Sequence, residues 1–185
     1  PVYGHQWRHF NAKYNDCNTD YSNQGIDQLQ NIINQLKTDE GRKSRRLIMS
    51  AWNPCQLDEM ALPPCHVMAQ FHVSENKYLS CSLYQRSGDV GLGVPFNIAS
   101  YSFLTHIIAK HTDLEAKEFV YFLGNAHIYE EHDEALKEQI LRKPYEFPRL
   151  QIKDKKENIN DYCLDDIEWK TEYKYHSAIK MEMKA

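Results

Sequence analysis

Residues 66–86 read HVMAQFHVSENKYLSCSLYQR, and this stretch decides the fold. Apolar and polar residues alternate almost one by one from 66 to 73 and again from 78 to 86, which is the period of a strand with one buried face. Between the two runs, Glu75-Asn76-Lys77 supplies a short polar turn. Two alternating runs around such a turn predict an antiparallel hairpin.

Helices and further strands flank this hairpin in the sequence. Apolar residues recur at helical spacing from Ile26 to Leu36. The stretch from Phe96 to Ile108 is apolar nearly all round, which predicts a helix buried at the centre of the domain. Because strands and helices follow one another without regular alternation, we expect the α+β fold class. The other expected elements are strands at 47–52, 118–123, 150–153 and 167–170, a polar-faced helix at about 129–141, and loops at 8–25, 39–46 and 88–95.

Composition narrows the class of protein. The 185 residues suffice for one domain with a substantial core, and the net charge of −4 argues against nucleic-acid binding driven by bulk charge. The five cysteines include no CxxC pair, which favours free thiols in a reducing compartment over disulfides or a zinc site, and the histidines are scattered. No apolar run reaches the roughly 20 residues that a membrane helix needs, and no signal peptide is visible.

Cys65 is the candidate nucleophile, because it follows Pro63-Pro64 directly and precedes the first strand of the hairpin. The two prolines fix their φ angles and cannot continue a ladder, so the thiol is expected on a stiff turn. Thiol chemistry depends on the thiolate, which needs nearby positive charge or hydrogen-bond donors. A lone cysteine at a strand start is more often a small core residue, so its neighbours decide the interpretation.

Three further polar clusters supply those neighbours. They are Arg45-Arg46, the run Gln85–Asp89 with Asn97 shortly after it, and Gly124–Tyr129. Arginines and a serine hydroxyl suit a phosphate, and an asparagine offers a donor and an acceptor that match an amide-like base edge. The simpler alternatives are a solvated arginine pair, a turn-forming Asp89, a helix-capping Asn97 and a structural His127.

The ordered motifs of this chain resemble those of thymidylate synthase over essentially all 185 residues. The resemblance implies a mixed β-sheet with a buried central helix and a dimer that packs sheet to sheet. The loop from Tyr14 to Gly25 looks like the eukaryotic branch, which includes bifunctional enzymes fused to dihydrofolate reductase. The matching motifs are Tyr3–Arg8, Arg45-Arg46, Ser50–Asn53, Met60–His66, Tyr84–Asp89, Leu92–Tyr101, Gly124–Tyr129 and Ile179–Met181.

The resemblance also implies a reaction. Cys65 would add to C6 of dUMP, and 5,10-methylenetetrahydrofolate would supply the one-carbon unit and the hydride, giving dTMP and dihydrofolate. Asn97 would read the O4/N3 edge of uracil, and no metal is implied. The dUMP site would comprise Arg45 and Arg46, which reach across a homodimer, with Cys65, His66, Gln85, Arg86, Ser87, Gly88, Asp89, Asn97, His127 and Tyr129. His66 on its own reads as structural. The folate site would comprise Asp89, Leu92, Gly93, Phe96 and, in a closing C-terminal tail, Lys184.

The chain departs from the family pattern at its start and at its end. Residues 1–185 would form a thymidylate synthase domain without the family's N-terminal part, which usually supplies a catalytic glutamate and a further arginine. The tail reads Met183-Lys184-Ala185 where the family usually has small apolar residues. Two rival functions therefore stand beside the enzyme: a truncated fragment without turnover of its own, and an RNA-binding autoregulatory role. The expected location is the cytoplasm, with the nucleus or mitochondrion as alternatives.

Overall fold

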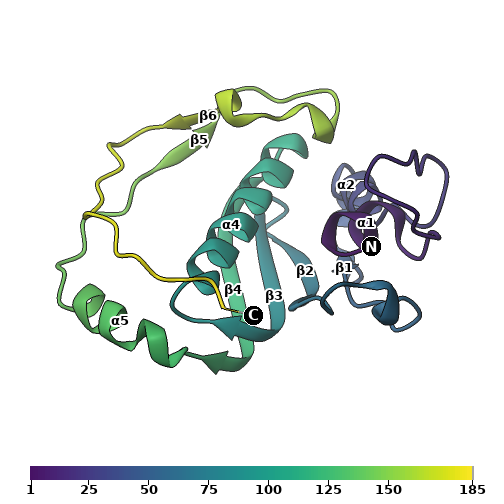
Figure 1. Ribbon diagram of the computed structural model, residues 1–185. Coiled ribbons are helices and arrows are strands. Elements are labelled where there is room, and N and C mark those ends of the chain that lie inside the picture. Colours follow the sequence, from purple (N-terminus) through teal and green to yellow (C-terminus); the bar gives the residue numbers. More distant parts are fainter. Residues whose placement is uncertain (185) are drawn as a thin grey trace.

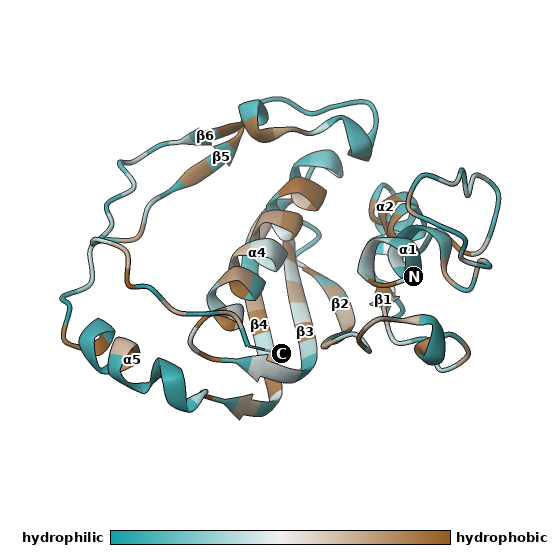
Figure 2. Cartoon of the chain, in the orientation of Figure 1, coloured by the Kyte–Doolittle hydropathy of each residue, from teal (hydrophilic) through white to brown (hydrophobic). Residues whose placement is uncertain are grey.

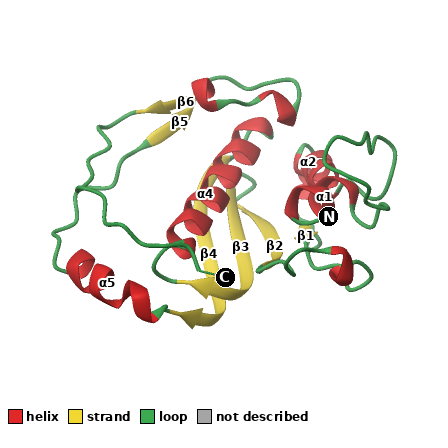
Figure 3. Cartoon of the chain, in the orientation of Figure 1, coloured by secondary structure: helices red, strands yellow, loops and turns green. Residues whose placement is uncertain are grey.

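A four-stranded mixed sheet forms the centre of the protein (Figure 1, Figure 3), in a computed structural model that describes residues 1–184. The predicted hairpin is confirmed. Strands β2 (His66–Ser74) and β3 (Tyr78–Asp89) pair antiparallel, and β1 (Ile48–Ser50) joins the other edge of β2 antiparallel. Strand β4 (Glu115–His127) pairs with β3 in parallel, after the crossover helix α4 (Gly93–His111). The α+β class with a mixed sheet is thus confirmed.

The strand register gives the sheet one core face and one open face. Rows of directly paired residues run across all four strands, and rows alternate between the two faces. The row Met49, Ala69, Leu83 and Tyr121 belongs to the core side. The next row belongs to the open face and comprises Ser50, Met68, Tyr84 and Phe122. On that open face the large apolar side chains Ile48, Met68, Tyr84, Val120 and Phe122 are all exposed.

Helices α2 (Gln28–Leu36) and α4 cover the core face of the sheet. The helical spacing in α2 is confirmed, since it buries Leu29, Ile32, Ile33 and Leu36, and Asp27 caps its first turn by accepting from the Gln30 backbone N–H. Many residues of helix α4 are hydrophobic, as its brown segments show in Figure 2. The chain buries α4 on one side only: Tyr101, Thr105, Ile108 and Ala109 face the core, whereas Phe96 and Ile98 remain exposed.

Three expected loops contain regular structure instead. Helix α1 (Tyr3–His9) overlaps the start of the stretch expected as a loop from residue 8, and α3 (Asp39–Arg42) lies within the charged segment before β1. The glycine-rich stretch 88–95 is also mostly regular, because β3 continues to Asp89 and α4 begins at Gly93. No side-chain cap marks the start of α1, and the parallel partner that extends β3 is distant in sequence.

The C-terminal third forms an arm away from the sheet and then returns to it. After β4 come η2 (Glu130–His132), α5 (Asp133–Ile140) and a small antiparallel pair, β5 (Leu150–Ile152) with β6 (Ile167–Trp169). The strands expected near 150 and 167 and the polar-faced helix are therefore present. Short 3₁₀ turns stand at Leu57–Glu59, Ile159–Asp161 and Leu164–Asp166. The last residues run back, so that the C-terminal end lies beside the ends of β3 and β4 (Figure 1).

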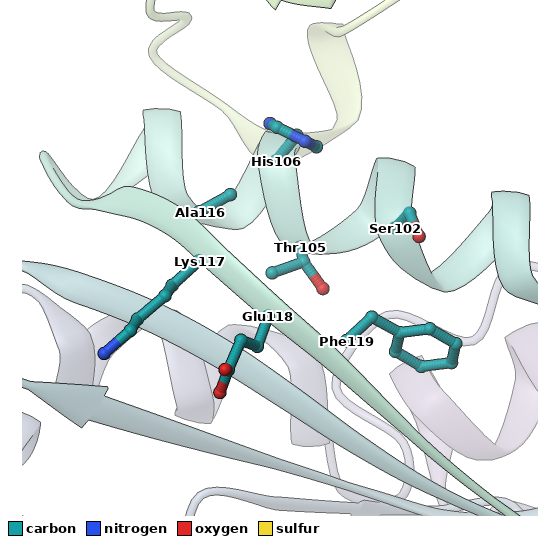
Figure 4. Close-up of a pocket in the computed structure, with 7 residues that line it drawn as sticks. All are labelled: Ser102, Thr105, His106, Ala116, Lys117, Glu118 and Phe119. Carbon is teal, nitrogen blue, oxygen red and sulfur yellow. The ribbon is translucent and has the colours of Figure 1, made fainter. Parts of the chain in front are cut away.

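A bulge in β4 opens a small cavity under α4. Between the pairs Leu79↔Ala116 and Cys81↔Phe119, one residue of β3 faces two residues of β4, Lys117 and Glu118. Figure 4 shows both of these side chains pointing away from α4. The cavity of about 130 Å³ is lined by Ser102, Thr105, His106, Ala116, Lys117, Glu118 and Phe119, and none of them belongs to the predicted site.

Candidate functional site

Cys65 sits on a turn that several hydrogen bonds hold against the start of β2. Its backbone N–H donates to the Tyr3 hydroxyl at 2.9 Å, and its carbonyl accepts from the Arg86 backbone N–H at 2.9 Å. Pro64 is buried, while Cys65 itself is half-buried. Burial raises the pKa of the Tyr3 hydroxyl, which keeps it protonated. The stiff turn predicted from the two prolines is thus present, and Tyr3 fastens it.

Arg86 closes the same turn from the side of β3. Its guanidinium donates through Nε to the Pro64 carbonyl at 3.0 Å and through a terminal nitrogen to the Pro63 carbonyl at 2.7 Å. The group also lies 5.8 Å from the ring centroid of Trp52, within cation–π range. A fixed positive charge therefore stands beside the turn that carries Cys65.

Cys81 shows what an ordinary core thiol looks like in this protein. It is fully buried in β3, and burial raises the pKa of its thiol to about 12. It stays protonated at neutral pH and cannot act as a nucleophile. Cys65 differs because it is reachable from solvent and lies next to Arg86.

Gln85 organises the polar network behind Cys65. Its Nε2 donates to the Ser87 carbonyl at 2.8 Å and to Asn97 Oδ1 at 3.0 Å, and its Oε1 accepts from the Tyr121 hydroxyl at 2.7 Å. Gln85 is 2% exposed, so all three bonds form away from bulk water. This network fixes Asn97, in the first turns of α4, relative to the strand that carries Arg86.

His66 completes this network on the side of β2. It pairs with Gln85 across the hairpin, and its ring lies near the Asn97 side chain. Burial lowers the pKa of His66, an effect that the Asn97 side chain only partly offsets. The ring is therefore neutral at neutral pH. These contacts agree with the interpretation of His66 as a structural residue, and they place it next to Asn97, the residue expected to recognise the base.

The end of β3 and the start of α4 form one tight corner. Asp89 Oδ1 accepts from the backbone N–H of Gly91 at 3.0 Å and of Leu92 at 3.3 Å, so Asp89 does form the turn that the simpler alternative proposed. At Gly88 a Cβ would lie 2.6 Å from Leu123 Cδ1, so the Leu123 side chain would have to shift to admit one. At Gly93 the nearest atoms would be 3.7 Å away, which leaves room.

His127 and Tyr129 lie next to each other at the end of β4. Their ring centroids are 5.2 Å apart with the rings nearly perpendicular, and His127 Nδ1 lies 3.1 Å from Asn125 Oδ1. Only His127 stands on the strand, because β4 ends at His127 and Tyr129 begins the turn into η2. The change of direction still leaves the two side chains adjacent.

A larger cavity separates the start of α4 from the returning tail. Its volume of about 640 Å³ falls in the range of small-molecule sites. From α4, Phe96 lines this cavity and is 69% exposed. In the tail, Lys184 forms an ion pair of 3.0 Å with Glu131. The lining residues are Phe96, Gln139, Arg142, Pro144, Tyr173, His176, Ser177, Ala178, Ile179 and Met181.

Arg45 and Arg46 are not at this end of the sheet. Both are exposed, and the segment that carries them runs beside the later part of β2, where Leu47 O accepts from Phe71 N at 2.8 Å. Six residues separate Cys65 from Phe71, which corresponds to about 20 Å along a strand. Within one chain the arginine pair is therefore far from the candidate nucleophile.

The structure adds supporting residues to which the sequence analysis gave no role. Tyr3 and Tyr121 support the site through hydrogen bonds, and His132 lies buried beside Asp89. Tyr3 supports Cys65 because the two residues are neighbours in the fold, which their positions in the sequence do not show. Among residues 1–184, no group of three His, Cys, Asp or Glu side chains gathers as a metal site. No helix within this described part is long and apolar enough to cross a membrane.

Comparison with known proteins identifies the relatives of this chain. The family described as "Thymidylate synthase" matches residues 1–185. A "Bifunctional dihydrofolate reductase-thymidylate synthase" of Paramecium tetraurelia is 58% identical over 99% of this chain and 38% of its own length. The "Thymidylate synthase" proteins of Saccharomyces cerevisiae and Homo sapiens are each 55% identical over 99% of this chain, which covers 62% and 57% of them respectively. The chain thus spans less than two thirds of each of these relatives.

Proposed function

The chain belongs to the thymidylate synthase family, and from that premise we propose that it takes part in the reductive methylation of dUMP to dTMP, with 5,10-methylenetetrahydrofolate as one-carbon and hydride donor. The observation that carries the proposal is the convergence at one end of the sheet. There the turn of Cys65, the guanidinium of Arg86 and the amide of Asn97 are joined by hydrogen bonds through Gln85 and the proline carbonyls. A nucleophile, a cation and a base-reading amide are groups that the first step of this reaction needs.

The proposed chemistry begins at Cys65. Its thiolate adds to C6 of the uracil ring, and the electron pair of the C5–C6 double bond moves toward O4, so that C5 becomes a carbon nucleophile. Asn97 serves this step from its fixed orientation, because Oδ1 can accept from N3–H while Nδ2 donates to O4. The positive charge of Arg86 favours the thiolate. C5 then attacks the methylene carbon of the folate, and C5 loses its proton as the bond from that methylene to the folate nitrogen breaks. A hydride from the released tetrahydrofolate reduces the methylene to a methyl group while the bond from sulfur to C6 breaks, which gives dTMP, dihydrofolate and the free thiolate.

The remaining nucleotide contacts follow the same arrangement. We propose that Arg86 and Ser87 bind the phosphate, and that His127 and Tyr129, whose rings are adjacent, hold the 3′-hydroxyl of the deoxyribose. Folate would occupy the space between the corner at Asp89, Leu92 and Gly93 and the tail at Lys184, and the 640 Å³ cavity beside Phe96 is large enough for part of it.

We also propose that the protein acts as a homodimer through the open face of the sheet. Exposed apolar side chains on the described chain, with Tyr84 at 46% and Phe122 at 57%, support this assignment. An isologous pairing of two such faces about a two-fold axis that crosses the strands would bring opposite ends of the two sheets together. Arg45 and Arg46, which lie far from Cys65 in their own chain, would then reach the phosphate in the partner's site.

Three further expectations remain proposals. The catalytic unit would include sequence that corresponds to the family's N-terminal part. A dihydrofolate reductase domain in the same polypeptide is supported by the bifunctional relatives named above. The cytoplasm remains the proposed location.

Replacement of the nucleophile tests the proposed reaction. In the protein as its gene encodes it, Cys65→Ser is expected to lower turnover at least about 10³-fold, because a serine hydroxyl is a far weaker nucleophile at neutral pH. It should also abolish the covalent adduct that 5-fluoro-dUMP forms with the wild-type protein and folate, measured by intact mass. Cys163→Ser, at an exposed free cysteine on the arm, is the matched control and should keep both. Substantial turnover and an adduct in Cys65→Ser would refute the assignment.

The dimer is tested separately by sedimentation equilibrium. Phe122→Glu places a charge on the open face and should shift the protein to the monomer mass. Phe147→Glu is the control, because Phe147 is 93% exposed on the arm, away from the sheet. A wild-type protein that is monomeric at micromolar concentration would disprove the proposed interface.

A further inference from the structure

His132 is a fully buried polar residue that the proposed reaction does not use. It ends η2 with 0% of its side chain exposed. Its Nε2 lies 2.7 Å from the carbonyl oxygen of Glu182, in the tail, and a carbonyl can only accept, so Nε2 carries the hydrogen. Its Nδ1 has no hydrogen-bond partner among residues 1–184 and lies 3.6 Å from Asp89 Oδ1.

Three segments of the chain converge on this ring. A Cβ built at Gly91 would lie 3.0 Å from His132 Nδ1, 3.4 Å from Met181 Sδ and 3.5 Å from Asp89 Oδ1. The Tyr129 ring lies edge-on, with its centroid 5.7 Å from that of His132. The corner after β3, the turn into η2 and the tail therefore all meet at one imidazole.

The tail has other contacts to the same region, but those are exposed. Lys184 pairs with Glu131 in an exposed ion pair, Arg142 donates to the Ser177 carbonyl, and His176 Nε2 lies 2.9 Å from the Lys143 carbonyl. Exposed ion pairs contribute little because water screens them. The bond from His132 to Glu182 is partly buried and its imidazole is fully enclosed, so water competes with this bond less than with the exposed contacts.

We propose that His132 is a positioning residue that couples docking of the C-terminal tail to Asp89. Through Nε2 the ring holds the backbone of Glu182, and through Nδ1 it faces the carboxylate that ends β3. The inference rests on the proposed function in one respect: Asp89 and the tail are both assigned there to folate. Any group that fixes the Asp89 carboxylate then also fixes the tail, so folate binding and closure become one event.

Three substitutions distinguish the role of Nε2 from the role of Nδ1. His132→Gln places an amide donor near the position of Nε2 and can keep the bond to Glu182. His132→Asn places its polar group near Nδ1, beside Asp89, and is too short to reach the tail. His132→Phe keeps most of the volume and removes both polar atoms. A residue that only fills space would respond to size, whereas a residue that positions the tail responds to which polar atom is kept.

Hydrogen exchange of the tail in the ligand-free protein measures docking directly. Exchange in a peptide covering residues 176–184 is expected to become about tenfold faster in His132→Phe and His132→Asn, and less than about threefold faster in His132→Gln, as the loss of one shielded hydrogen bond predicts. With substrates, the KM for folate should rise about tenfold in His132→Phe while that for dUMP changes less than about twofold.

The outcomes divide the possibilities. Unchanged tail exchange in a folded His132→Phe protein, or equal effects of Gln and Asn, would overturn the inference. If His132→Phe fails to fold, the comparison of Gln with Asn decides alone. If the wild-type protein does not methylate dUMP, the proposed function fails, and tail exchange still decides whether His132 holds the tail.

Discussion

Gln85→Leu should reduce the preference of the site for uracil over cytosine, although the Gln85 side chain itself is not expected to contact the base. The Ser87 carbonyl can only accept a hydrogen bond, and it lies 2.8 Å from Gln85 Nε2, which fixes the direction of the Gln85 amide. The same Nε2 therefore requires an acceptor at 3.0 Å, and Asn97 meets this with Oδ1. In this orientation Asn97 matches the N3–H and O4 of uracil. Rotated by 180°, its amide would match the N3 and exocyclic amine of cytosine.

The size of this effect follows from the contacts. A rotated Asn97 in the wild-type protein loses one hydrogen bond, about 0.5–1.5 kcal/mol, and leaves a shielded donor unsatisfied, about 1–3 kcal/mol. Gln85 thus favours the observed orientation of the Asn97 amide by roughly 2–4 kcal/mol. Leucine removes that preference, so discrimination between dUMP and dCMP should fall at least about tenfold, because 1.4 kcal/mol is a factor of ten.

The measurement is the ratio of the dissociation constants for dUMP and dCMP, by titration calorimetry. Gln85→Leu also leaves the Tyr121 hydroxyl and the Ser87 carbonyl without their partner, so the free energy of unfolding should fall by about 2–4 kcal/mol. Tyr121→Phe is the matched control, since it removes only the bond to Oε1 and should leave the ratio within about twofold. An unchanged ratio in a folded Gln85→Leu protein would refute the reasoning.

The other predictions concern packing, the nucleophile turn and pH. Gly124→Ala should lower stability by about 1–3 kcal/mol in urea unfolding, because its Cβ would lie 2.8 Å from the backbone oxygen of Arg86, whereas Gly93→Ala should cost little. Equal effects at the two glycines would contradict this. Tyr3→Phe removes the acceptor of the Cys65 N–H and should cost about 1 kcal/mol of stability and slow adduct formation; an unchanged adduct rate would count against the turn's role. Burial lowers the folded-state pKa of several histidines, so the unfolded chain binds more protons below about pH 6.5 and the free energy of unfolding should fall from pH 7 to pH 5; a flat profile would show that they are not buried neutral. These residues are His5, His66, His106 and His111.

Local patterns predicted the elements that carry their own signal. The hairpin of β2 and β3 was predictable because alternation and a polar turn both lie within 21 residues of sequence. Helix α1 was missed because nothing local marks it: its buried Gln6 bonds to Gln56, fifty residues away. The extension of β3 to Asp89 was missed for the same reason, since its partner in β4 comes later in the chain and the glycines suggested a loop.

The site shows the same division. The motifs gave the chemical groups, yet their support comes from contacts that no local pattern contains. Tyr3 meets Cys65 across 62 positions, and Tyr121 meets Gln85 across 36. Full burial of α4 was predicted from its apolar composition, whereas the described chain leaves Phe96 exposed. Composition reports how much apolar surface a helix has, and only the surrounding structure determines what covers it.

Strand directions explain why one chain holds most of the proposed site and cannot hold all of it. β2 begins where its antiparallel partner β3 ends, and β4, parallel to β3, ends there too. The same end of the sheet therefore holds three of the proposed site residues: Cys65 before β2, Arg86 near the end of β3 and His127 at the end of β4. β1 runs antiparallel to β2, so Arg45 and Arg46, which precede β1, must lie toward the opposite end of the sheet. No change of side-chain conformation spans that length of sheet, and the proposed phosphate contacts of this pair consequently require a second copy of the chain.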